Sequence, residues 1–103
     1  FLILNLHAMK VVTIVCESYA REPVTQLLRI VGANGWTLFP VEGEGSHGKR
    51  FADIQESANI QIEVIVPPEV SAQLLEKLSD ELFAPYAMIA FESEVRVLRP
   101  GKF

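Results

Sequence analysis

One stretch of the sequence combines residue types that could hold an anion. Residues 43–57 read GEGSHGKRFADIQES, with three glycines, a histidine and two adjacent cations. The glycines are Gly43, Gly45 and Gly48. Such glycines let consecutive backbone N–H groups point into one concavity, and Lys49 and Arg50 could then neutralise a phosphate placed there. The pattern predicts a phosphate cradle, with a flexible solvated loop as the alternative.

Patterns typical of catalysis or of metal binding are weak in the rest of the chain. A serine beside His47 lacks a third orienting group that spacing would reveal. His7 and His47 lie far apart in the sequence without neighbouring cysteine ligands, so no metal is expected. Glu92 and Glu94 could form an acid–base pair, but solvated charges on a strand are the simpler interpretation. The sequence therefore favours a binding protein that is not an enzyme.

The elements that must position this loop alternate between strands and helices. Apolar runs predict strands at 10–16, 36–41, 60–66 and 86–98. Two amphipathic helices are predicted between them. Their apolar stripes are Ala20, Val24, Leu27, Leu28 and Val31, and Val70, Leu74, Leu75, Leu78 and Leu82. The order β-α-β-β-α-β predicts an α+β, ferredoxin-like sandwich.

Turn residues and prolines refine this order of elements. Asn34 and Gly35 are expected to supply the left-handed backbone that ends the first helix. Pro67 and Pro68 close the third strand, and a helix follows at once. Pro40 lies inside the second predicted strand and cannot donate a ladder hydrogen bond, which predicts an edge strand. The second strand is an edge strand in the ferredoxin-like topology.

One face of the predicted sheet and the long loop are left unexplained by folding alone. Two helices cover one face of a four-stranded sheet, yet Val11, Val12, Ile14 and Val15 place apolar side chains on both faces. Exposed apolar sheets are rare on monomers, so closed symmetric self-association is expected, with an apolar-faced monomer as the alternative. A hairpin needs two to five residues where residues 43–57 stand, which indicates a functional loop.

Composition and charge narrow the class of protein. The chain has 103 residues, half of them hydrophobic, which predicts one globular domain. Nine basic against thirteen acidic residues give a net charge of -4, which argues against a nucleic-acid partner. The single cysteine, Cys16, fits a reducing cytoplasm, and no stretch is long and apolar enough to cross a membrane. We expect residues 1–8 to be an upstream or cloning-derived segment and Met9 to be the natural start.

The order of elements, the loop and its glycines together resemble the PII-like signalling proteins. The resemblance covers residues 9–101, which we expect to form the domain. Its most specific parts are the run GWTL at 35–38 leading into VEGEG at 41–45, and VRV at 95–97. The chain is most similar to the PII-like branch associated with bicarbonate transport and carboxysomes.

The resemblance implies a cytoplasmic homotrimer that binds an adenine nucleotide (AMP, ADP or cyclic AMP) between subunits and signals through residues 43–57, the T-loop of this family. It also implies bicarbonate as a possible second ligand, and a membrane bicarbonate transporter or another carbon-fixation protein as a possible partner. The nucleotide-binding residues that it implies are Thr37, Phe39, Gly43, Gly45, Ser46, His47, Lys49, Arg50, Met88, Arg96 and Arg99. The alternative is a trimeric divalent-cation tolerance protein of the CutA kind, which shares the architecture.

The chain departs from the nitrogen-regulating members in ways that bear on the ligand. Residues 43–57 contain no tyrosine to be uridylylated, and His47 stands where those members place a glutamine for Mg and 2-oxoglutarate. Arg96 matches a family arginine, whereas Arg99 is displaced by one residue and would face the other side of a regular strand. Residues 83–88 lack the cation that the family uses for the outer phosphates. AMP, ADP or cyclic AMP is therefore expected to bind at least as well as ATP.

Overall fold

The computed structural model describes residues 4–45, 48–49 and 58–99. The elements run β1 (His7–Glu17), a short 3-10 helix η1 (Ser18–Ala20), α1 (Arg21–Ile30), β2 (Thr37–Val41), β3 (Glu44–Gly45), β4 (Gly48–Lys49), β5 (Asn59–Val66), α2 (Pro68–Glu81) and β6 (Met88–Val97). The four long strands and two helices follow the predicted β-α-β-β-α-β order. The two short strands β3 and β4 pair with each other inside the region predicted as the long loop.

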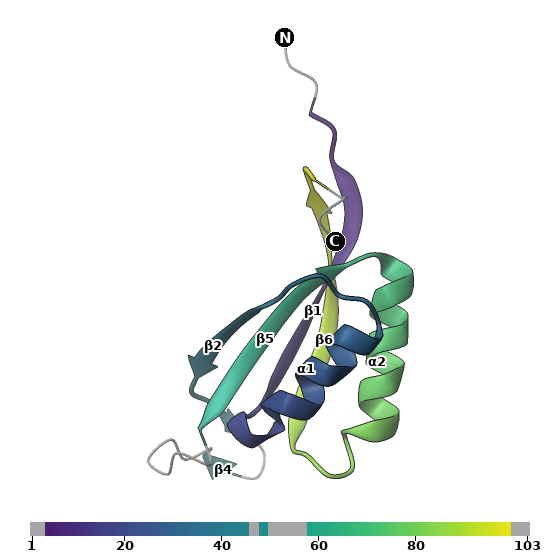
Figure 1. Ribbon diagram of the computed structural model, residues 1–103. Coiled ribbons are helices and arrows are strands. Elements are labelled where there is room, and N and C mark those ends of the chain that lie inside the picture. Colours follow the sequence, from purple (N-terminus) through teal and green to yellow (C-terminus); the bar gives the residue numbers. More distant parts are fainter. Residues whose placement is uncertain (1–3, 46–47, 50–57, 100–103) are drawn as a thin grey trace.

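The main sheet has the strand order β2-β5-β1-β6, and each neighbouring pair is antiparallel. Both helices lie on one side of this sheet (Figure 1). This arrangement confirms the α+β ferredoxin-like fold. It also confirms that β2 is an edge strand, where Pro40 pairs opposite Ile60 without having to donate to a second neighbour.

The hydrophobic core lies between the sheet and the two helices. Its fully buried members include Val12, Ile14 and Cys16 of β1, Ile62 and Val66 of β5, Val24 and Leu28 of α1, and Leu74 and Leu78 of α2. The predicted helical stripes are therefore the faces that meet the sheet. Pro68 opens α2, where its missing N–H costs nothing because the first helical N–H groups have no partner within the helix.

The end of α1 differs from the sequence-based expectation. Gly32, with φ of +87°, and not Asn34 or Gly35, adopts the left-handed backbone. The Ala33 N–H donates to the Leu28 carbonyl at 2.9 Å and the Gly32 N–H donates to the Arg29 carbonyl at 3.1 Å. These two bonds form the Schellman arrangement, which satisfies the last carbonyls of the helix one turn earlier than expected.

The strands β1 and β6 are the longest of the sheet and pair over ten positions. β1 begins at His7, before the expected domain start, and its first two residues pair with Val97 and Arg96. The paired ends of β1 and β6 therefore project beyond the helices as a two-stranded ribbon, the purple and yellow strands above the body of Figure 1.

The sheet face opposite the helices carries apolar side chains, as the sequence predicts. Successive side chains along a strand point to opposite faces of the sheet, and cross-strand partners share a face. The residues that alternate with the buried core positions along each strand therefore point away from the helices. Ile89 and Phe91 of β6 lie on this face with 56% and 49% of their surface exposed. We call this surface the open face; it includes Val11, Thr13, Val15, Thr37, Phe39, Gln61, Glu63, Ile65, Ile89, Phe91 and Ser93.

The buried stripe of α2 generates a stability prediction. Leu74→Ala should lower the free energy of unfolding by about 2–5 kcal/mol, because Leu74 is fully buried and its loss leaves a cavity. Gln73→Ala, at an exposed position of the same helix, should change it by less than about 0.5 kcal/mol. Urea denaturation at one fixed protein concentration measures both. Equal effects of the two substitutions would contradict the core described above.

Candidate functional site

The sheet order separates the nucleotide-binding residues predicted from the sequence into two groups. Thr37 and Phe39 lie on β2, at one edge of the sheet, while Met88 and Arg96 lie on β6, at the other edge. β5 and β1 lie between them, so the two edges are about 14 Å apart. A single copy of the chain therefore does not bring the two groups together.

A cavity of about 250 Å³ lies on the open face beside Thr37. Its lining residues are Val11, Gly35, Trp36, Thr37, Glu63 and Ile65. Thr37 and Glu63 are direct cross-strand partners, so a hydroxyl and a carboxylate stand side by side between apolar walls. This combination suits a flat, largely apolar group that carries hydrogen-bond donors.

Glu63 was not among the residues predicted from the sequence. The Gln61 Nε2 donates to Glu63 Oε2 at 3.3 Å, which gives this carboxylate a defined partner on its own strand. Phe39 lies opposite Gln61 on the neighbouring strand and is half-buried. The alternation of polar and apolar residues along β5 indicates that Glu63 faces away from the core, but its position opposite Thr37 depends on the strand register.

The wall of this cavity is anchored from the helix side of the sheet. Trp36 packs against the hydrophobic core, and the Arg29 guanidinium carbon lies 5.5 Å from the centre of its ring. This distance is within the range of a cation–π interaction. Arg29 Nη1 also lies 4.0 Å from Glu22 Oε1, so α1 holds the segment just before β2 in place.

The predicted phosphate cradle lies only partly within the residues that the structure describes. Gly43 is exposed after the end of β2, and β3 and β4 pair so that Gly45 lies opposite Gly48 and Glu44 opposite Lys49. Ser46, His47 and Arg50 lie outside the described residues.

The two predicted site residues of β6 lie near opposite ends of that strand. Met88 is half-buried and packs against the core, whereas Arg96 is exposed, eight positions or about 26 Å further along. Arg96 lines a second cavity, of about 410 Å³, together with Ala8, Met9, Lys10, Pro68, Glu94 and Val95. Arg99 is exposed just after the strand ends.

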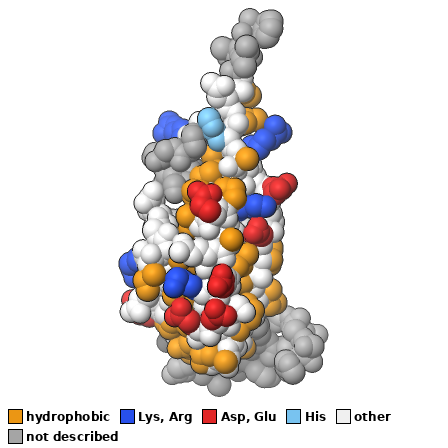
Figure 2. Space-filling model, turned by 90° about the vertical axis from the view of Figure 1, so that its right-hand side faces the viewer, with side chains coloured by type: hydrophobic (Ala, Val, Ile, Leu, Met, Phe, Trp, Pro, Cys, Tyr) orange, Lys and Arg blue, Asp and Glu red, His pale blue; other side chains and the backbone are white. Residues whose placement is uncertain are grey.

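The surface on the α2 side of the molecule carries both positive and negative side chains (Figure 2). Basic and acidic side chains alternate there with hydrophobic ones, and no broad basic patch gathers on it (Figure 2). Within residues 4–45, 48–49 and 58–99 there is no group of three or more His, Cys, Asp or Glu residues that could hold a metal ion. No helix in the described part of the chain is long and apolar enough to span a membrane.

Comparisons with known proteins agree with this architecture. The family model for nitrogen regulatory protein P-II matches residues 9–102. A PII-like signalling protein of Thermus thermophilus is 40% identical, with a TM-score of 0.84, and the alignment covers 97% of this chain and 99% of that one.

A second group of solved structures comes from CPII, a nitrogen regulatory PII-like protein of Thiomonas intermedia. Its complex with ADP, AMP and bicarbonate is 30% identical, with a TM-score of 0.89 and 98% of each chain covered. Its apo form is 27% identical, with a TM-score of 0.74, and the alignment covers 90% of this chain and 95% of that one. No curated protein sequence matches the chain. The matched family model, which spans nearly the whole chain, shows that this protein belongs to the P-II family, within which its relatives are PII-like signalling proteins.

Proposed function

We propose that this protein is a regulator that binds an adenine nucleotide between its subunits and signals through residues 43–57. The observation that carries the proposal is the placement of the predicted site residues at opposite edges of one sheet. A second copy can bring its β6 edge to the β2 edge of the first, which would unite the two groups. The apolar open face between the edges supplies a surface for that contact.

The cavity beside Thr37 is the proposed site for the adenine base. Its apolar residues offer a surface against which a flat ring packs, and the Glu63 carboxylate can accept a hydrogen bond from an exocyclic amine or a ribose hydroxyl. CPII of Thiomonas intermedia, which binds ADP and AMP, supports an adenine nucleotide as the ligand class.

The cationic residues of the loop and of β6 are the proposed partners of the phosphates. Lys49 and Arg50 on the loop, with Arg96 of a neighbouring subunit, would neutralise one or two phosphates. Residues 83–88 contain no lysine or arginine for a third. A mono- or diphosphate, or cyclic AMP, is therefore the proposed effector in preference to ATP.

A role in inorganic carbon metabolism is the finer part of the proposal. CPII was solved in complexes that contain both ADP and bicarbonate, which supports bicarbonate as a co-ligand. We infer that the partner is a bicarbonate transporter or another carbon-fixation protein, recognised through residues 43–57 in the nucleotide-bound state. The alternative, a divalent-cation tolerance protein of the CutA kind, would be supported by a cluster of metal ligands, and the described residues contain no such cluster.

The assembly generates the first functional prediction. Light scattering should give about three times the chain mass, because a closed trimer buries the open face. Phe91→Glu should yield monomers that bind no nucleotide, since it places a charge on that face. Ile30→Glu, at an exposed apolar position of α1, should remain trimeric. A monomeric wild-type protein at micromolar concentration that still bound nucleotide would contradict the intersubunit site.

The ligand generates the second prediction. Calorimetry with and without bicarbonate should show AMP, ADP or cyclic AMP binding at least as tightly as ATP. Glu63→Gln should weaken all of them by roughly tenfold or more, because a charge-assisted hydrogen bond is worth about 1.5–3 kcal/mol. Arg50→Ala should also weaken all of them.

Glu69→Ala provides the control, since Glu69 is exposed at the start of α2 and lines neither of the two cavities. It should leave every affinity unchanged. Tight, Mg-dependent binding of ATP with much weaker binding of AMP and ADP would contradict the proposal that the site neutralises only one or two phosphates.

A further inference from the structure

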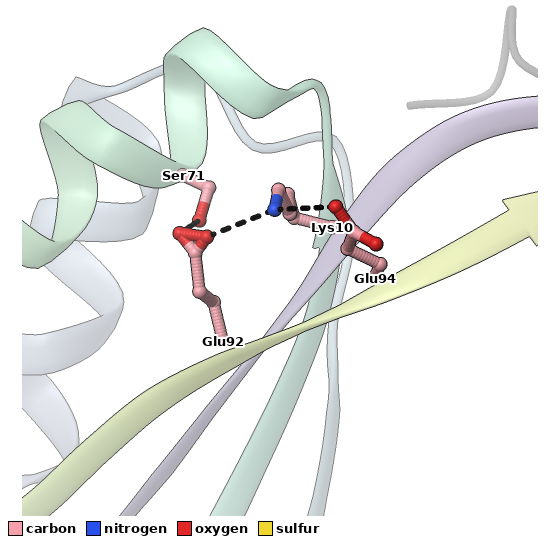
Figure 3. Close-up of polar contacts among 4 residues, drawn as sticks. All are labelled: Lys10, Ser71, Glu92 and Glu94. Carbon is pink, nitrogen blue, oxygen red and sulfur yellow. Dashed lines mark hydrogen bonds and ion pairs between the residues drawn. The ribbon is translucent and has the colours of Figure 1, made fainter.

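A chain of polar contacts connects α2, β6 and β1 on the helix side of the sheet. The Ser71 hydroxyl donates to Glu92 Oε1 at 3.2 Å. Lys10 Nζ lies 3.4 Å from Glu92 Oε2 and 3.5 Å from Glu94 Oε1 (Figure 3). The lysine of β1 therefore bridges two acidic residues of β6.

This contact chain holds Lys10 in a defined position. Ser71 is fully buried, and it engages one oxygen of Glu92 while Lys10 engages the other. The side chain of Lys10 is only 23% exposed, whereas that of Glu94 is 88% exposed. Lys10 is thus anchored at its inner partner, Glu92, and it also pairs with the more exposed carboxylate of Glu94.

Arg96 is the next residue of β6 on the same side as Glu94. Side chains two positions apart on a strand share a face and lie about 6.6 Å apart, which is within reach of a glutamate and an arginine. Both residues line the cavity of about 410 Å³ that Lys10 also lines. Among the residues that the structure describes, the Arg96 side chain takes part in no hydrogen bond or ion pair.

We infer that Lys10 is a positioning residue that keeps Arg96 available for phosphate. By pairing with Glu94, Lys10 removes the one neighbouring carboxylate that could capture the guanidinium from within the same strand. Without Lys10, Glu94 pairs with Arg96, and a nucleotide phosphate must compete with that pair. The inference rests on the proposed nucleotide function, and it assigns to the Lys10–Glu94 contact a part in setting phosphate affinity.

The test compares Lys10→Met with the double variant Lys10→Met/Glu94→Gln by calorimetry. Lys10→Met should weaken ADP and AMP about two- to fivefold, the range expected for competition by one exposed ion pair. The double variant should recover wild-type affinity, because the amide no longer competes for Arg96. Adenosine, which has no phosphate, should bind all three proteins equally.

A matched control uses an ion pair on the same side of the molecule. Lys77 Nζ lies 3.9 Å from Glu81 Oε2 on α2, so Lys77→Met makes the same change of charge without touching the Arg96 neighbourhood. It should leave ADP affinity unchanged. An equal loss in Lys77→Met would mean that net charge alone is responsible and would overturn the inference.

Two further outcomes would overturn the inference. If Glu94→Gln fails to restore affinity, Lys10 contacts the ligand itself or supports the fold. If adenosine weakens as much as ADP, the effect does not act through phosphate.

A measurement without ligand separates this inference from the proposed function. The Nε–H NMR signal of Arg96 should shift in Lys10→Met, because Glu94 then pairs with the guanidinium. The signal should return to its wild-type position in the double variant, which has no carboxylate at position 94. An unmoved signal would overturn the inference whether or not nucleotides bind. A wild-type protein that binds no adenine nucleotide would instead overturn the proposed function.

Discussion

Burial of one face of the sheet beneath α1 and α2 is the constraint on which the rest of this structure depends. The core positions of β1 and β5 pack against the stripes of both helices on that face and are buried from water. Burying a leucine or isoleucine side chain contributes about 1.5–3 kcal/mol, so this layer supplies most of the driving force for folding. The opposite face receives the alternate residues of the same strands and has no helix to cover it. Its exposed Ile89 and Phe91 are the physical reason to expect a second copy there.

The strand order converts this one-sided packing into a divided site. β2 and β6 are the two edges, so one copy of the chain keeps the predicted nucleotide-binding residues of β2 apart from those of β6. Each edge also has its own support. Arg29 and Trp36 brace the segment before β2 from α1, while Ser71 of α2 and Lys10 of β1 organise the acidic residues of β6. The helices therefore stabilise the sheet and also position side chains near both of its edges.

Much of the fold could be predicted from the sequence, because its signals are local. Helical spacing located the buried leucines of α2, and Pro40 marked the edge strand through its missing N–H. Where two local signals pointed to different residues, the sequence alone could not decide between them. Gly32 and Gly35 both suit a helix end, and the choice of Gly32 depends on where packing of Leu27 and Leu28 lets the last carbonyls of α1 find donors. The start of β1 at His7 likewise depends on the pairing partner that β6 offers.

The candidate site was determined partly by sequence and partly by tertiary structure. The sequence by itself determined the chemistry available: a loop with glycines and adjacent cations, an absence of cations at residues 83–88, and a match to the P-II family. Only the tertiary structure decided that Glu63 stands opposite Thr37, since a one-residue change of register would turn Glu63 to the helix side. It also decided that Lys10 meets Glu94, 84 positions away in the chain. Local patterns report the preferences of each segment, whereas contacts between distant segments exist only once the buried face has fixed how the strands are aligned.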